Sequence, residues 1–244
     1  MIATEVSLPK QGVEFSPLAK IVHDPVAYGT TWLVTGEPGT GKTTLAFQFA
    51  LQGLRRGESA VFVACDEPPA RIENNLRSFG FGTSAYEREK KFILVDAFSR
   101  LASGPFHISD RTDVAEFTYV IARAVEVTGR PCRIIVDSLT SISVNMAPRD
   151  FLTLVYEKNR TLRHDGHVLL DLYLTQKDEE GAWYTLTNAY DVLIDLSLTE
   201  ERGGVPKRSL RLRKLRGGTY DPRPFPFTIR PQQGILVNTH YYEE

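Results

Sequence analysis

The segment Gly36-Glu37-Pro38-Gly39-Thr40-Gly41-Lys42-Thr43 satisfies the pattern GxxxxGK[ST] at every specified position. The apolar run at 31–34 that precedes it is typical of a buried strand, and residues 44–56 after it have the pattern of a helix. A strand, a glycine-rich loop and a helix in this order are the context that the pattern requires. The chain is therefore predicted to fold around a P-loop that binds a nucleoside triphosphate with Mg²⁺.

The residue types of this loop suit phosphate binding. Glycines let backbone N–H groups approach phosphate oxygens, and the N-terminus of the following helix adds a partial positive charge. Lys42 is expected to reach the β- and γ-phosphates, and the Thr43 hydroxyl to ligate Mg²⁺. The other predicted nucleotide-binding residues of this segment are Gly36, Glu37, Pro38, Gly39, Thr40, Gly41 and Thr44. A glycine-rich turn that carried a lysine by chance would lack the flanking strand and helix.

Composition excludes several classes of protein. The 244 residues suffice for one large α/β domain or two small ones, and 42% hydrophobic with 24% charged residues is ordinary for a globular chain. A net charge of −1 gives no global electrostatic case for nucleic acid or membrane binding. No run approaches the roughly 18 apolar residues of a membrane span, and the N-terminus does not resemble a signal peptide. Cys65 and Cys132 are expected to be small buried residues. A cytoplasmic location is expected.

Strand and helix patterns alternate from residue 30 onward, after a proline-containing lead-in arm over residues 1–29. Strands are predicted at 59–66, 92–98, 133–139 and 167–174, and helices at 70–79, 113–127 and 150–164. Near-continuous apolar strands between helices predict an α/β fold with a mostly parallel sheet covered on both faces. Three consecutive strands at 192–200, 207–216 and 227–237 predict an antiparallel extension of the sheet. The chain is thus interpreted as one domain, 1–244, with a C-terminal β extension over 190–237.

A carboxylate at the end of an apolar strand is the second part of a nucleotide site. Asp137 ends the apolar run 133–137, so it is delivered to the edge of the sheet where α/β proteins bind ligands. Asp137 is predicted to hold Mg²⁺, either directly or through a water molecule. Asp96 is the rival candidate, but its strand is less apolar, and it is expected to cap a turn.

Asp66 and Glu67 follow the strand after the P-loop helix and are candidates for orienting the attacking water. Alternation along a strand would send their side chains to opposite faces, so only one is expected to point into the site. The alternative is that both begin the next helix, where acidic residues are favoured.

Three segments together resemble the KaiC-like branch of the RecA superfamily over residues 30–237. They are the P-loop with its helix at 36–49, the run Val63-Ala64-Cys65-Asp66-Glu67-Pro68-Pro69, and Lys214-Leu215-Arg216-Gly217-Gly218 followed by Phe225-Pro226-Phe227-Thr228-Ile229. The resemblance implies a RecA-like fold that binds ATP and Mg²⁺. The acidic pair of that family is usually two glutamates, and since the first residue here is Asp66, the resemblance favours Glu67 as the catalytic carboxylate.

The same resemblance implies that Lys214 and Arg216 reach across a subunit interface to the ATP of a neighbour. It therefore implies a homo-oligomeric ring, commonly a hexamer, with ATP between subunits. An arginine given in this way stabilises the charge of the phosphoryl-transfer transition state. The alternative for 207–216 is a solvated basic strand, because its arginines alternate with leucines.

The chain also departs from the family. Members usually carry a Gly-Leu-Asp and glycine-rich segment before the first strand, and residues 16–29 replace it here. Gln176, which follows the strand at 167–174, is interpreted either as a γ-phosphate sensor or as a turn residue. Thr187 lies near the position where the second domain of the clock protein autophosphorylates, which raises autokinase activity as a further hypothesis.

The predicted function is Mg²⁺-dependent ATP hydrolysis in a ring that works as a regulatory or signalling switch. One alternative is a DNA-acting recombinase or helicase with contacts from loops at 141–149 and 175–183. The second loop is acidic, whereas loops that contact phosphates should be basic, so nucleic acid is not the favoured partner. Arg149, Arg160 and Arg163 can nevertheless gather on one helix.

Another alternative is a nucleotide sensor that binds ATP with negligible hydrolysis. The intact set of Lys42, Thr43, Asp137 and Glu67 argues against it. The sequence names no protein partner.

Overall fold

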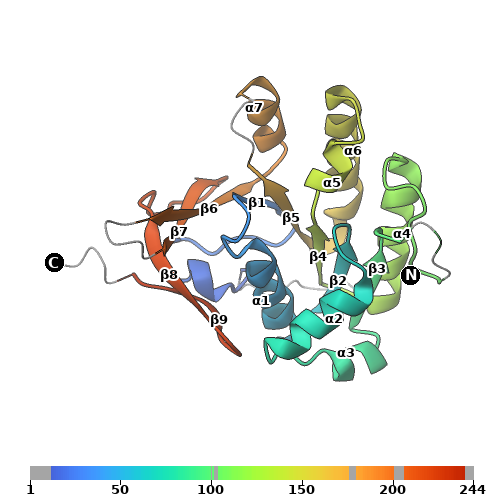
Figure 1. Ribbon diagram of the computed structural model, residues 1–244, viewed down its shortest axis with the longest axis horizontal. Coiled ribbons are helices and arrows are strands. Elements are labelled where there is room, and N and C mark those ends of the chain that lie inside the picture. The colour runs from blue at the N-terminus through green and yellow to red at the C-terminus, as the bar shows by residue number, and fades with distance from the viewer. Residues whose placement is uncertain (1–11, 100, 102–103, 176–179, 201–205, 240–244) are drawn as a thin grey trace, which may run out of the picture.

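The computed structural model describes residues 12–99, 101, 104–175, 180–200 and 206–239. They form a nine-stranded sheet with helices on both faces (Figure 1). The strand order is β3-β2-β4-β5-β1-β6-β7-β8-β9. The strands from β3 to β6 in this order pair in parallel, and β7, β8 and β9 extend the sheet by antiparallel pairing. The predicted mostly parallel sheet with antiparallel C-terminal strands is confirmed.

The strands are β1 (Thr31–Gly36), β2 (Ser59–Ala64), β3 (Phe92–Asp96), β4 (Cys132–Asp137), β5 (Val168–Leu174), β6 (Val192–Glu200), β7 (Pro206–Leu215), β8 (Phe225–Arg230) and β9 (Gly234–Val237). The α-helices are α1 (Lys42–Arg55), α2 (Pro69–Ser78), α3 (Ser84–Arg88), α4 (Val114–Thr128), α5 (Thr140–Ser143), α6 (Pro148–Leu162) and α7 (Glu180–Asn188). Two short 3₁₀ turns, η1 (Ser16–Leu18) and η2 (His164–Gly166), complete the described elements.

The apolar runs of the parallel strands are explained by cover on both faces of the sheet. Trp32 and Val34 of β1 point into a core shared with α1 and α2. Leu33, between them, points into a second core shared with α4 and α6. Because alternate residues enter different cores, a strand in the middle of this sheet must be apolar at every position. Figure 1 shows the two helical layers on either side of the sheet. Within the described ranges, no helix combines the length and apolar content needed to cross a membrane.

Three of the predicted segments differ in the structure. The single strand expected at 227–237 is a hairpin of β8 and β9, because Gln232 and Gly234 adopt left-handed backbone conformations, with φ of 63° and 78°. The loops expected at 141–149 and 175–183 are partly helical, since α5, the start of α6 and the start of α7 occupy them. Residues 176–179 of the second loop lie outside the described residues.

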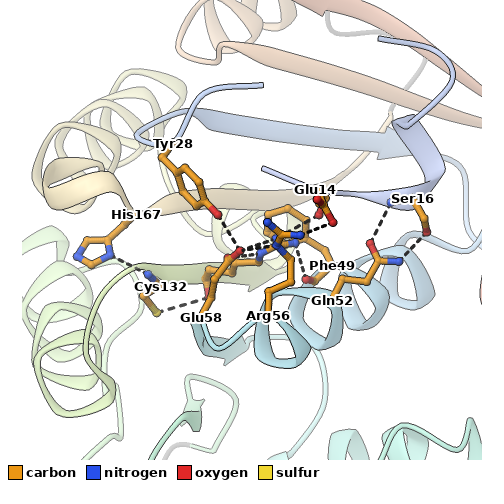
Figure 2. A network of polar contacts seen from close by, with 10 residues as sticks. Glu14, Ser16, Tyr28, Phe49, Gln52, Arg56, Glu58, Cys132 and His167 are labelled. Carbon is orange, nitrogen blue, oxygen red and sulfur yellow. Dashed lines mark hydrogen bonds and ion pairs between the residues drawn. The ribbon is translucent and has the colours of Figure 1, made fainter. Parts of the chain in front are cut away.

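The described part of the lead-in arm packs against the P-loop helix. Phe15 and Leu18 are buried in the same core as α1. The Ser16 hydroxyl accepts hydrogen bonds from the side chains of Gln48 and Gln52, at 3.0 and 2.6 Å. Figure 2 shows the Gln52 contact with Ser16 beside the polar network around Glu58. The arm therefore contributes to the core and to the position of α1.

A buried ion pair lies at the amino ends of β2 and β4. The Arg133 guanidinium donates two hydrogen bonds to the Glu58 carboxylate, at 2.6 and 3.0 Å, and both side chains are almost fully buried. Arg133 also donates to the carbonyl of Phe49 and lies 4.6 Å from the centre of its ring. The Tyr28 hydroxyl donates to Glu58 at 2.9 Å, as Figure 2 shows. Burial, followed by the charge of Glu58, raises the pKa of Tyr28.

Removing one charge of this pair is expected to destabilise the fold strongly. Glu58→Gln leaves the Arg133 guanidinium buried without its counter-charge, which costs about 3–5 kcal/mol. The double variant Glu58→Gln with Arg133→Met removes both charges and should regain much of that loss. Urea denaturation of the wild-type chain and these two variants measures the free energies of unfolding.

The matched control is Glu73→Gln, because Glu73 pairs with Arg77 on the exposed face of α2 at 3.3 Å. An exposed pair of this kind contributes less than about 1 kcal/mol. Equal loss of stability in Glu58→Gln and Glu73→Gln would contradict the role given to the buried pair.

Candidate functional site

The parallel strands bring the P-loop and the acidic residues to one edge of the sheet. β1 ends at Gly36, where the P-loop begins. β2 and β4 end in register, with Ala64 opposite Asp137. Since parallel strands share their direction, the residues that follow their carboxyl ends converge. This edge therefore carries the loop 36–43, the acidic pair after β2 and the carboxylate of β4.

Two glycines of the P-loop are required by their surroundings. Gly36 has φ 148°, and a Cβ there would overlap the carbonyl oxygen of Leu196 on β6. Gly41 has φ 107°, and a Cβ there would lie 2.8 Å from Cδ1 of Ile229 on β8. The first lets the loop leave the sheet tightly, and the second lets the β8–β9 hairpin pack against it.

The Lys42 ammonium lies inside the curve of the P-loop. It donates to the carbonyls of Gly36 and Glu37, at 2.7 and 3.0 Å. Burial lowers its pKa, and the carboxylates of Asp137 and Asp66 oppose that shift. The first residue of α1 thus places a cation beside the loop and within the field of two carboxylates.

Thr43 and Asp137 meet at the predicted metal position. The Thr43 hydroxyl donates to Asp137 Oδ2 at 2.9 Å. Burial raises the Asp137 pKa to about 7, the Thr43 hydrogen bond and Lys42 oppose the rise, and Asp66 and Glu67 add to it. A hydroxyl and a carboxylate are the oxygen ligands that Mg²⁺ takes from P-loop proteins.

The Thr43 hydroxyl and the Asp137 carboxylate suit a Mg²⁺ ion that is also bound by phosphate. They do not form a metal site made of protein ligands alone. In the part of the chain that the structure describes, no three His, Cys, Asp or Glu side chains gather as a metal site. Thr43 and Asp137 would supply two ligands and leave the other positions to phosphate oxygens and water, the coordination that Mg²⁺ favours.

The rival carboxylate Asp96 has a different setting. It ends β3, which is separated from β4 by β2. Its Oδ1 accepts hydrogen bonds from the backbone N–H groups of Phe98 and Ser99, at 3.0 and 2.9 Å. This is the turn-capping geometry expected of it.

Asp66 and Glu67 both line the same cavity, which differs from the expectation that only one would point into the site. The reason is that β2 ends at Ala64, so the alternation of a strand does not extend to them. Asp66 Oδ2 accepts from the Ser138 hydroxyl at 2.7 Å. The Glu67 carboxylate contacts Arg71 at 3.3 Å and accepts from Asn75 at 3.1 Å.

The cavity has a volume of about 460 Å³ and extends from the acidic residues to the far end of α2. Its lining comprises Thr43, Thr44, Phe47, Asp66, Glu67, Ile72, Asn75, Ser78, Phe79 and Asp137. Phe47, Ile72 and Phe79 form the apolar part of this lining, which suits the planar face of a base. These apolar lining residues were not predicted from the sequence, because the amphipathic pattern of a helix does not indicate which of its residues border a cavity.

Lys214 and Arg216 lie at the opposite edge of the sheet from the P-loop of the same chain. Leu215, between them, pairs with Val192 at the start of β6, which in turn pairs with the start of β1. The Lys214 ammonium donates to the carbonyl of Thr187 at 3.0 Å. Arg216 contacts Asp191 at 3.2 Å. The structure therefore brings Thr187, Lys214 and Arg216 together, apart from the P-loop and the acidic residues of their own chain.

Arg208 contacts the P-loop of its own chain and was not found from the sequence. Its guanidinium donates to the carbonyl of Gly39 at 3.4 Å. Its Nε is buried and has no hydrogen-bond partner among the described residues. The alternating pattern of 207–216 could have predicted the contact of Arg208 with the P-loop only if the register of β7 in the sheet had been known. Gln176, the other predicted phosphate contact, lies outside the described residues.

The fold and this site define a P-loop nucleotide-binding protein of the RecA type. The family model described as the KaiC ATPase matches residues 15–242. The chain therefore belongs to the KaiC ATPase family, in the RecA superfamily.

Individual proteins agree with this membership. The chain is 31% identical to a UPF0273 protein of Thermotoga maritima over 224 residues, which cover 89% of this chain and 91% of that protein. It is 28% identical to the circadian clock protein KaiC3 of Synechocystis over 86% of this chain and 41% of the clock protein. The crystal structure of a KaiC-like protein from Pyrococcus horikoshii superposes with a TM-score of 0.74 at 28% identity, covering 89% of this chain and 93% of that one.

Proposed function

We propose that the protein hydrolyses ATP with Mg²⁺ at the carboxyl edge of its sheet. The observation that supports this most is the contact between Thr43 and Asp137 at 2.9 Å, beside the ammonium of Lys42. A bound Mg²⁺ would supply charge stabilisation for the transferred phosphoryl group. In this proposal the P-loop binds the phosphates, and the apolar part of the cavity lining holds the base.

Glu67 is the proposed residue for orienting the attacking water. Its carboxylate lines the cavity and is held by Arg71 and Asn75, both from α2. Two partners restrict the rotation of a carboxylate and so favour one direction for the water. Asp66, held by Ser138, is the second acidic residue next to the metal position.

The proposed assembly is a homo-oligomeric ring, a hexamer in the form common to this family, with ATP between subunits. Arg216 and Lys214 cannot reach the P-loop of their own chain from the opposite edge of the sheet. If they serve catalysis, a neighbouring copy must bring that edge to the nucleotide. Arg216 would then exchange its contact with Asp191 for the phosphate, where its charge stabilises the transition state. Hydrolysis would thereby alter the packing of copies, as a regulatory switch requires.

The DNA-acting alternative is not favoured by the charges on α6 and at its C-terminal end. Of the three arginines noted there, Arg160 is paired with Glu157, and Arg163 lies 3.7 Å from Asp191. Arginines that are already paired offer less to a phosphate backbone. Autophosphorylation of Thr187 would likewise need a neighbouring nucleotide, because Thr187 lies near the edge opposite its own P-loop.

Loss of Lys42 or Glu67 should affect different steps. Lys42→Ala is expected to abolish ATP hydrolysis and weaken nucleotide binding, since it removes the cation that faces the β- and γ-phosphates. Glu67→Gln is expected to bind ATP normally and to lower kcat by about 100-fold or more, because a positioned carboxylate contributes that much. Steady-state phosphate release with Mg²⁺ and binding of a fluorescent ATP analogue measure the two steps.

The control is Glu73→Gln on the same helix, which carries an exposed carboxylate outside the cavity and should match the wild-type chain. Full turnover in Lys42→Ala would contradict the proposed site. Full turnover in Glu67→Gln would contradict only the role of Glu67 and would leave the rest of the proposed site unaffected.

Mixing two inactive variants tests whether Arg216 acts on a neighbour. Arg216→Ala should bind ATP and lose hydrolysis. Lys42→Ala retains Arg216 but lacks a working P-loop. A mixed assembly contains interfaces that join an intact P-loop to an intact Arg216, so part of the hydrolysis should return on mixing. Full activity of Arg216→Ala by itself would remove the proposed role in trans.

A further inference from the structure

Arg111 joins the elements that carry the acidic residues of the site. It lies in the turn before α4, and its guanidinium donates to the carbonyl of Cys65 at 2.7 Å. That carbonyl belongs to the peptide bond between Cys65 and Asp66. A hydrogen bond from a charged donor is about twice as strong as a neutral one, so it fixes the orientation of this peptide.

The same guanidinium reaches the strand end that carries Asp137. It donates to the Ser141 hydroxyl at 3.4 Å, and that hydroxyl donates to the carbonyl of Ser138 at 3.2 Å. The Ser138 hydroxyl in turn donates to the Asp66 carboxylate at 2.7 Å. These contacts form a closed chain from Arg111 through two serines to Asp66, and back through the Cys65 carbonyl.

The turn that presents Arg111 is itself rigidly held. Asp110 accepts from the backbone and hydroxyl of Thr112, and Asp113 caps α4 by accepting from two backbone N–H groups. Glu116 accepts from Ser109 and from the backbone of Asp110. Hydrogen bonds from Thr112 lower the pKa of Asp110, and those from Ser109 lower that of Glu116. Although carboxylates surround the turn, Arg111 has no ion pair within the described ranges and directs its charge to the Cys65 carbonyl.

We propose that Arg111 is a positioning residue for ATP hydrolysis, which holds the Cys65–Asp66 peptide and the Asp66 carboxylate in the geometry that the acidic pair needs. The inference rests on the proposed function. Arg111 is absent from the cavity lining, and its contacts join only the acidic strand ends. It therefore acts on the orientation of Asp66 and of the adjoining Glu67, and leaves phosphate binding to the P-loop.

Substitution of Arg111 should separate kcat from nucleotide affinity. Arg111→Gln is expected to lower kcat by about tenfold or more, since small displacements of catalytic groups cost that much, while the KM for ATP changes little. Arg111→Lys keeps a charged donor for the Cys65 carbonyl and should recover much of the rate. Ser141→Ala removes only the branch toward Ser138 and should give a smaller decrease in kcat.

The matched control is Arg123→Gln, because Arg123 is an exposed arginine of α4 whose guanidinium lies 5.9 Å from the ring of Tyr119. Phosphate release and binding of the fluorescent analogue are measured for all variants beside the wild-type chain. If Arg111→Gln does not fold, Arg111→Lys and Ser141→Ala still decide the matter through their kcat values.

The outcomes are distinct. Absence of hydrolysis in the wild-type chain would contradict the proposed function, and this inference with it. An active wild-type chain with equal kcat in Arg111→Gln and Arg123→Gln would overturn the role of Arg111 alone. An equal loss of kcat and of nucleotide affinity, without recovery by lysine, would show a structural role and also overturn it. A fall in kcat alone, recovered by lysine, is the result that the geometry predicts.

Discussion

The P-loop leaves the sheet from β1, and β1 is hydrogen-bonded on both sides by parallel strands. Gly36 faces Leu174 of β5 on one side and Leu196 of β6 on the other. The approach to β6 is so close that a Cβ at Gly36 has no room. The origin of the loop is therefore fixed by backbone pairing. Asp137 and the acidic pair reach the loop because β4 and β2 run in the same direction as β1 and end at the same edge.

The two edges of the sheet use charge differently. At the amino edge of the parallel strands, Arg133 and Glu58 form a buried, mutually satisfied pair that binds the lead-in arm to the core. At the carboxyl edge, Asp66, Glu67 and Asp137 lie around one cavity. Arg71 contacts Glu67, and the charge of Lys42 opposes the rise in the pKa of Asp137. The first arrangement stabilises the fold. The second leaves negative charge, which in the proposed function Mg²⁺ and a cation from a neighbouring copy would offset.

Sequence patterns predicted what depends on local chemistry or on strand direction. The apolar strands, the P-loop and the approach of Asp137 to Thr43 follow from run length, glycine placement and parallel order. The hairpin at Gln232 was missed because apolar residues flank a turn whose left-handed conformation is not typical of glutamine. The shared orientation of Asp66 and Glu67 depended on where β2 ends. Arg111 contacts Cys65, which lies 46 positions away in the sequence, and Arg208 contacts Gly39, which lies 169 positions away. No local sequence pattern specifies such pairs.

The most direct test is an experimental structure of the assembled protein with Mg²⁺ and a non-hydrolysable ATP analogue. The account predicts phosphates on the loop 36–43, Mg²⁺ between Thr43 and Asp137, and Arg216 of a second copy at the γ-phosphate. A nucleotide bound elsewhere on the chain would contradict the site. A nucleotide site formed entirely by one chain, in which Arg216 keeps its contact with Asp191, would contradict the proposal that ATP lies between two subunits.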